Sequence, residues 1–173
     1  MISDPARIYV DAAPLIDLVK FRVGVEPKGA TANDNWTLDR LLAAGRAGDV
    51  TLITSTLTVA ECTHVSDPDK LDAAKPFFMG LLASGKGGIV FVQPSFTIAE
   101  KARNLRWIHS LSFKGADAVH VASAIHMGCS EILTGDGRII SASSALQAMG
   151  LRACKPSDTA HLPSQYRQNN LDV

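Results

Sequence analysis

Short apolar runs, rich in residues that favour strands, alternate with helical segments along most of this chain. The runs are residues 7–10, 51–54, 89–92, 131–134 and 151–154. Runs this short and this apolar are typical of strands buried on both faces of a parallel sheet. Because helical segments separate them, the pattern indicates right-handed crossovers. We therefore predict an α/β fold, a three-layer α/β/α sandwich around a mostly parallel sheet of five strands.

The segments between the runs carry helical signals. Asp67 before Pro68 is typical of a helix start, Thr97 and Glu100 have capping-box spacing, and a glycine after a helix favours its end. Residues 22–35 lack periodicity and predict a loop. The predicted helices are residues 15–21, 36–47, 68–82, 97–107, 115–127 and 141–149.

The length of 173 residues suits one domain with a substantial core. We predict one α/β domain over residues 1–155 and a polar, loosely attached tail over 156–173. Three isolated cysteines and the lack of a secretory signal favour a reduced, cytoplasmic protein. No apolar run approaches the length that a bilayer requires. The net charge is zero, so bulk composition says nothing for or against nucleic-acid binding.

Four acidic residues fall where parallel strands end. Asp11 directly follows the first run and Asp136 follows the fourth. Asp117 lies in the first turn of the helix that leads into the fourth run, and Glu61 lies on the helix after the second. Binding sites in open parallel sheets lie beyond the carboxyl ends of the strands. We therefore expect all four carboxylates at one edge of the sheet.

Converging carboxylates repel one another unless a cation neutralises them. Oxygen ligands of this kind suit Mg²⁺ or Mn²⁺, which keep several of their waters. Such an ion lowers the pKa of a bound water and neutralises charge on a phosphodiester. The four acids therefore indicate metal-assisted hydrolysis of a phosphate ester, with one ion or two.

Each acid also has a structural interpretation. Asp11 is a suitable N-cap, and Glu61 has capping-box spacing in its helix. Asp117 is favoured at a helix start and could pair with Lys114, while Asp136 lies between two glycines, as turn residues do. Both interpretations stay open for each residue alone. Their joint placement at one edge of the sheet favours a functional site.

The order of these motifs resembles the PIN-domain family, and within it the VapC-type toxins of prokaryotic toxin–antitoxin pairs. The resemblance covers residues 8–154. Its most specific part is the helix start GADAVHVASAI at residues 115–125, followed by ILTGDGRI at residues 132–139. One departure is the Asp11-Ala12-Ala13-Pro14 stretch, where many relatives have Ser or Thr shortly after the aspartate.

This resemblance implies a PIN-like fold and a Mg²⁺- or Mn²⁺-dependent endoribonuclease, a hydrolase of RNA phosphodiester bonds. It also implies a homodimer and, for VapC-type toxins, a cognate antitoxin that blocks the site. Thr134 matches a hydroxyl residue that supports the last acid. The acidic quartet of metal ligands and catalytic residues corresponds to Asp11, Glu61, Asp117 and Asp136.

Basic residues near these acids are candidates for binding substrate phosphates. They are Arg103, Arg106 and Lys114, which precede the helix of Asp117, and Arg138, which follows Asp136. A solvated helix face is an equally good interpretation of the first three.

Two other residue types near the acids have structural interpretations. His120 lies one turn from Asp117, and we favour a hydrogen-bonded structural histidine over a substrate contact. Trp36 and Trp107 are interpreted as core or dimer-interface residues.

Several other functions compete with a toxin ribonuclease. The chain could be a stand-alone PIN nuclease of RNA processing, or a degenerate domain that binds RNA or protein. A phosphatase that forms an aspartyl-phosphate on Asp11 usually needs a second Asp two residues on. That position is Ala13, which disfavours the phosphatase.

Overall fold

Five parallel strands form a single sheet in the order β3-β2-β1-β4-β5. The computed structural model describes residues 4–27, 29–83 and 87–167. All neighbouring strands are parallel, as in the predicted α/β sandwich. The strands are β1 (Ala6–Val10), β2 (Val50–Ser55), β3 (Ile89–Val92), β4 (Glu131–Leu133) and β5 (Arg152–Cys154).

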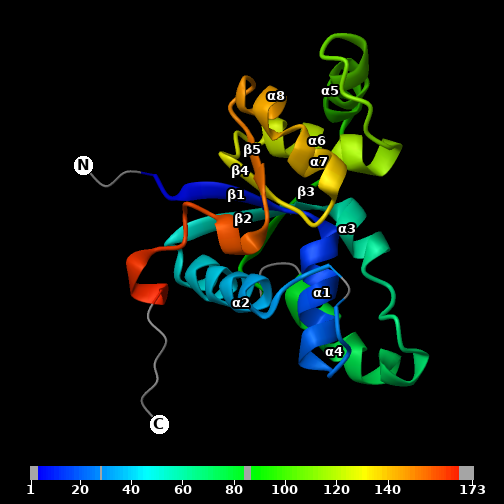
Figure 1. Cartoon of the computed structure of the whole chain (residues 1–173), viewed down its shortest axis with the longest axis vertical. Helices are drawn as coiled ribbons and strands as arrows, with labels where there is room; N and C mark the ends of the chain where they lie inside the picture. The colour runs from blue at the N-terminus through cyan, green and yellow to red at the C-terminus, as the bar shows by residue number, and fades with distance from the viewer. Residues whose placement is uncertain (1–3, 28, 84–86, 168–173) are drawn as a thin grey trace.

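Helices connect the strands and cover both faces of the sheet (Figure 1). None of the helices within the described ranges is long and apolar enough to cross a membrane. The α-helices are α1 (Ala12–Arg22), α2 (Ala32–Ala47), α3 (Thr56–Glu61), α4 (Leu71–Leu82), α5 (Phe96–Trp107), α6 (Gly115–His126), α7 (Gly137–Ser141) and α8 (Ser143–Gln147). Three short 3₁₀ turns are η1 (Pro68–Lys70), η2 (Pro156–Asp158) and η3 (Ser164–Tyr166).

The alternation of side chains along the strands creates two cores, one on each face of the sheet. In β1, Ile8 and Val10 face a core shared with α1, α2 and α4, whereas Tyr9 between them faces a core shared with α5, α6, α7 and α8. Leu52 and Ile53 divide in the same way along β2. This period of two is the expected geometry of a strand buried on both faces. The third layer of the predicted sandwich is therefore present.

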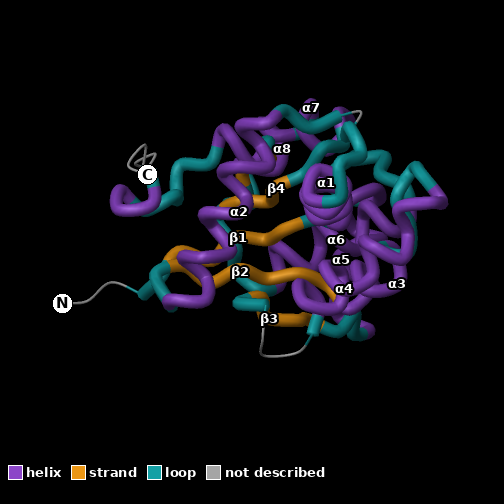
Figure 2. Tube along the Cα trace, turned by 90° about the horizontal axis from the view of Figure 1, so that it is seen from below, coloured by secondary structure: helices purple, strands orange, loops and turns teal. Residues whose placement is uncertain are grey.

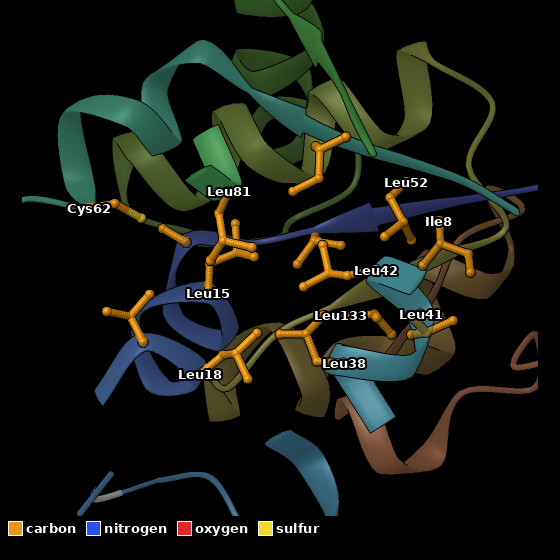
Figure 3. Packing of buried hydrophobic residues seen from close by; sticks show 14 of the residues in the cluster. Ile8, Leu15, Leu18, Leu38, Leu41, Leu42, Leu52, Cys62, Leu81 and Leu133 are labelled. Atoms are coloured by element: carbon orange, nitrogen blue, oxygen red, sulfur yellow. The ribbon is translucent and has the colours of Figure 1, made fainter. Parts of the chain in front are cut away.

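Leucines dominate the first of these cores (Figure 3). Leu15 and Leu18 of α1 pack near Leu38 of α2, and Leu81 reaches the same cluster from α4. Each fully buried side chain of this kind stabilises the fold by about 1.5–3 kcal/mol. Because α1 begins directly after β1, this packing also fixes the position of the chain segment at the end of β1.

Several predicted helices differ from the structure at their ends. The helix predicted to start at Thr97 begins at Phe96, because the hydroxyl of Ser95 accepts a hydrogen bond from the amide of Ile98 and so supplies the cap. The helix predicted over 68–82 begins with the 3₁₀ turn η1 before α4. The helix predicted over 141–149 corresponds to α8, which is separated from α7 at Ala142. At the start of α8, the hydroxyl of Ser143 exchanges hydrogen bonds with the backbone of Ala153 and so holds β5.

The predicted loop over 22–35 is shorter in the structure. α1 extends to Arg22, and α2 starts at Ala32 behind a reciprocal capping box between Thr31 and Asp34. Lys28 lies outside the described residues. The start of α2 at Ala32 was not predicted, because the first residues of this helix show little hydrophobic periodicity.

Residues 156–167 are attached to the domain rather than loose, and residues 168–173 lie outside the described part of the chain. The carboxylate of Glu131, which is only 2% exposed, accepts hydrogen bonds from the Thr159 hydroxyl at 2.6 Å, the Ala160 amide at 3.1 Å and the Arg152 guanidinium at 2.7 Å. Leu162 is buried in the first core. The polar composition of this segment led to the prediction of a loose tail, and it does not reveal these contacts. The division into 1–155 and 156–173 stays a prediction.

The strands end at one edge of the sheet, where α1, α3 and α6 lie close to the ends of β1 and β2 (Figure 2). Val10 is in register with Leu133, and the amide of Asp11 donates to the carbonyl of Leu133 at 3.0 Å. The residues that follow β1 and β4 are therefore neighbours across the sheet.

Candidate functional site

The four predicted acids lie at this edge in two pairs. Asp11 and Glu61, here called the inner pair, both lie close to the imidazole of His120. Asp117 and Asp136, the outer pair, share the guanidinium of Arg138. The inner pair comes from the end of β1 and the end of α3, and the outer pair from the starts of α6 and α7.

Asp11 is held by hydrogen bonds to both of its carboxylate oxygens. Oδ1 accepts from the amide of Ala12 at 2.8 Å, which makes Asp11 the N-cap of α1. Oδ2 accepts from the hydroxyl of Thr134 at 2.8 Å. The residue is only 8% exposed. Its structural and functional interpretations are therefore compatible, because each oxygen of an ionised carboxylate can accept more than one hydrogen bond.

Thr134 connects the inner pair to the outer pair. Besides donating to Asp11, its hydroxyl accepts a hydrogen bond from the backbone amide of Asp136 at 3.0 Å. The side chain is fully buried. Thr134 thus bonds the side chain of the first acid and the backbone of the last. It also supplies a hydroxyl to Asp11 in a chain that has alanines directly after that aspartate.

His120 lies at the centre of the inner pair. Its Nε2 is 2.8 Å from Oε2 of Glu61 and 3.7 Å from Oδ1 of Asp11, and its Nδ1 is 2.8 Å from the hydroxyl of Tyr9. The histidine is 1% exposed and Tyr9 is fully buried. Burial and the nearby charge of Asp11 raise the pKa of Tyr9 well above its usual value, so the phenol stays protonated.

The position of α3 is set by hydroxyl contacts at the end of β2. The Thr54 hydroxyl donates to the carbonyl of Val10 at 2.7 Å and lies 2.8 Å from the hydroxyl of Thr58. Ser55 caps the helix through the amide of Leu57. Thr58 therefore bonds to Thr54 rather than forming the capping box that its spacing to Glu61 suggested. Glu61 is the last residue of α3.

The outer pair is neutralised by an arginine, and its side chains, at 24% and 25% exposure, are less exposed than that of Glu61 at 31%. Nη2 of Arg138 lies 3.2 Å from Oδ2 of Asp117 and 2.9 Å from Oδ2 of Asp136. Hydrogen bonds from Arg138 lower the pKa of the Asp136 carboxyl below its usual value. Asp136 also caps α7 through the amide of Arg138 at 2.7 Å. The partner of Asp117 is therefore Arg138 rather than Lys114.

The other predicted substrate-binding residues lie on α5 and before α6. Arg103 stacks 4.6 Å above the ring of Trp107 and pairs with Glu100 at 3.7 Å, while Arg106 and Lys114 are exposed. Trp107 itself is 71% exposed, so the structure excludes the core interpretation for it and leaves the interface interpretation open. Arg138 is closest to the acids because it bonds to two of them.

The donor set decides which cation could bind here. All four acids offer hard oxygen atoms, which suit Mg²⁺ or Mn²⁺ held by one or two carboxylates and several waters. Within the described ranges, no three acidic, histidine or cysteine side chains are arranged as a ready-made metal site. The acids therefore fit a hydrated ion better than a closed cage, and Arg138 lies between the two carboxylates of the outer pair.

Comparisons with known proteins agree with this architecture. The PIN domain family model matches residues 8–144, so the chain belongs to the PIN domain family. One similar solved structure is described as FitAB bound to the IR36 DNA fragment, with a TM-score of 0.56 and 15% sequence identity over 89% of this chain and 98% of the other. That likeness shows the fold. A search of curated proteins found no match.

Two contributors to the site were not predicted from the sequence as functional. Tyr9 was not considered, and His120 was interpreted as structural. A signal for Tyr9 exists: it precedes Asp11 by two residues, so strand alternation directs both toward the same face of β1. The contact between His120 and Glu61 joins residues 59 positions apart, which no local pattern reveals.

Proposed function

We propose that this PIN domain is a Mg²⁺- or Mn²⁺-dependent endoribonuclease. The observation that carries the proposal is the meeting of four carboxylates, from the ends of β1 and α3 and the starts of α6 and α7, at the carboxyl edge of the sheet. Among the described residues the inner pair has no arginine or lysine partner, so a bound cation would stabilise it. PIN domains are in general nucleases, and this chain retains acids at all four positions that the resemblance implies.

Asp11, Glu61, Asp117 and Asp136 would hold the ion, directly or through water. When bound, Mg²⁺ or Mn²⁺ supplies activation of a water and neutralisation of phosphate charge. Asp11 is held in place by Thr134 and the start of α1. One of the four carboxylates would also orient the attacking water and accept its proton.

The residues on this edge can also orient the RNA. The water oxygen bonds to phosphorus and the bond to the 3′ oxygen breaks, which leaves a 3′-hydroxyl and a 5′-phosphate. Arg103, Arg106, Lys114 and Arg138 are proposed to bind phosphates that flank the scissile bond. Contacts of this kind position a strand without reading its bases.

We further propose that the protein is the toxin of a toxin–antitoxin pair and works as a homodimer in the cytoplasm. The resemblance of its motifs to VapC-type toxins supports the first part. Its fold likeness to a chain of the FitAB structure, which was solved with DNA, is compatible with that part. Exposed Phe96, Trp107 and Ile108 on and beside α5, at 78%, 71% and 68% exposure, support an interface with a second copy or an antitoxin.

A cleavage assay tests the ribonuclease. Purified protein should cut single-stranded RNA with Mn²⁺ or Mg²⁺ and stop when EDTA is added. Asp11→Asn and Asp117→Asn should each lower the rate by about 100-fold or more, because each removes a charged ligand. Asn still caps a helix, so Asp11→Asn should keep the far-UV circular dichroism of the wild type.

The matched control is Asp72→Asn, an exposed aspartate of α4 that pairs with Lys75. Its cleavage rate should equal that of the wild type. Full activity in Asp11→Asn or Asp117→Asn would remove these residues from the proposed site, and activity that persists in EDTA would exclude the metal.

A further inference from the structure

The carboxylate of Glu61 has little in its own helix to orient it. α3 has only six residues, and Glu61 is the last of them, where helix carbonyls repel a negative side chain. The side chain is 31% exposed, so water competes for it. Among the described residues, the one side-chain hydrogen bond to this carboxylate comes from His120, at 2.8 Å.

The imidazole that makes this bond is itself rigid. It is 1% exposed and lies on α6, which is packed in the second core. Its Nδ1 is 2.8 Å from the hydroxyl of Tyr9, a fully buried residue of β1. The Tyr9 and His120 rings meet edge to face, 5.9 Å between centroids. Glu61, at the edge of the sheet, is thus connected to the central strand β1 through the buried rings of His120 and Tyr9.

Hydrogen bonding determines which nitrogen of His120 carries a proton. A carboxylate can only accept, so the 2.8 Å contact requires a proton on Nε2. The phenol of Tyr9 then donates to Nδ1 of a neutral ring, or accepts from it if the ring is charged. In both forms Nε2–H points at Glu61. Without the Tyr9 hydroxyl, Nδ1 would lose the hydrogen bond that orients the ring, while the carboxylate of Glu61 would still favour a proton on Nε2.

We propose that His120 is a positioning residue of this site: it holds Glu61 beside Asp11 through Nε2–H, and the hydrogen bond between Tyr9 and Nδ1 orients the ring. This inference rests on the proposed metal-dependent function and adds how one ligand is kept in place. Outer hydrogen bonds commonly orient a metal ligand and change affinity by about 10–100-fold when removed. His120 itself does not have to touch the RNA or the ion.

A thermodynamic cycle on Mn²⁺ binding tests the inference. Isothermal titration calorimetry would compare wild type, Glu61→Gln, His120→Leu and the double variant. If His120 acts through Glu61, His120→Leu should weaken Mn²⁺ binding about 10-fold, and the double variant should bind no more weakly than Glu61→Gln alone. Additive losses would overturn the proposal, as would unchanged affinity in His120→Leu.

Two milder variants test the proposal even if His120→Leu fails to fold. Tyr9→Phe keeps the ring and removes the hydroxyl, and we expect a few-fold loss of Mn²⁺ affinity. His120→Gln retains an N–H donor near the Nε2 position and should recover part of the affinity lost in His120→Leu. The control is His161→Gln, because His161 bonds to Ser130 and none of the four acids. An equal loss in His161→Gln would indicate a general effect on the fold.

A second measurement needs neither metal nor RNA. Long-range ¹H–¹⁵N spectra of the metal-free protein should show His120 protonated at Nε2, both in the wild type and in Tyr9→Phe. A His120 ring protonated only at Nδ1 in the wild type would overturn the inference, whatever the nuclease assays show. Conversely, a protein that cleaves no RNA but shows the expected spectra would overturn only the proposed ribonuclease function.

Discussion

The inner pair and the outer pair of carboxylates are kept together by different means. Asp11 and Glu61 are held by a backbone amide, a threonine hydroxyl and a buried imidazole. Asp117 and Asp136 share one arginine whose side chain is half exposed. A buried carboxylate such as Asp11 needs hydrogen-bond donors in fixed places, whereas a partly exposed one such as Asp117 can be neutralised by a mobile charge. The inner pair is therefore held by buried donors, and the arginine bridge of the outer pair can rearrange.

The largest effect on folding stability should come from removing the hydroxyl that supports the inner pair. Thr134→Val keeps the shape of the side chain but leaves buried Asp11 Oδ2 and the amide of Asp136 each without a partner. We expect the free energy of unfolding to fall by about 2 kcal/mol, measured by urea denaturation.

The same change at an exposed site provides the reference. Thr97→Val on α5 should alter the free energy of unfolding by less than about 0.5 kcal/mol. If Thr134→Val were equally mild, hydrogen bonding would not be what holds the inner pair.

A smaller loss of folding stability is expected at the outer pair, together with tighter Mn²⁺ binding. Arg138→Gln removes the cation that lies between Asp117 and Asp136. Mn²⁺ should then bind a few-fold more tightly in calorimetry, because it no longer competes with the guanidinium. Stability should fall by less than about 1 kcal/mol, as for other exposed ion pairs.

Arg22→Gln serves as the control, since Arg22 pairs with Asp39 at the far end of α1. Its Mn²⁺ affinity should match the wild type. Weaker Mn²⁺ binding in Arg138→Gln would mean that the arginine supports the ion rather than excluding it.

The smallest effect is a dependence of stability on pH. Hydrogen bonds from Arg138 lower the pKa of Asp136, and a carboxyl with a lowered pKa contributes stability above its unfolded pKa that is lost as the pH falls through the folded one. The difference in unfolding free energy between wild type and Arg138→Gln should therefore be present at neutral pH and shrink below about pH 4. Urea denaturation across this range measures it, and a difference that persists in acid would assign it to packing.

The sequence predicted the fold better than the connections inside the site. The five strands were found because a buried parallel strand is apolar on both faces, as residues 8–10 of β1 are. The four acids were found because parallel strands end at one edge. The pairing of Arg138 with Asp117 was missed because it depends on where α7 starts relative to α6.

The positions of helix starts and ends were also predicted less well than the strands. Ser95 and Thr97 are both plausible caps by composition, and tertiary packing of Ile98 and Leu105 decided between them. The segment at 141–149 has helical composition, yet α8 covers only Ser143–Gln147, and the side chain of Ser143 bonds to β5 at its start. Local helix propensity does not include the effect of a contact with a strand that comes later in the chain.

The buried carboxylate of Glu131 has a consequence for where this protein can be cut. The family match ends at residue 144, yet donors that satisfy Glu131 come from Arg152, Thr159 and Ala160. A chain shortened to end at Lys155 would keep the arginine and lose the other two, leaving a charge in the sheet only partly compensated. We therefore expect a chain that ends at residue 144 or 155 to be less stable than one that keeps the residues up to Ala160.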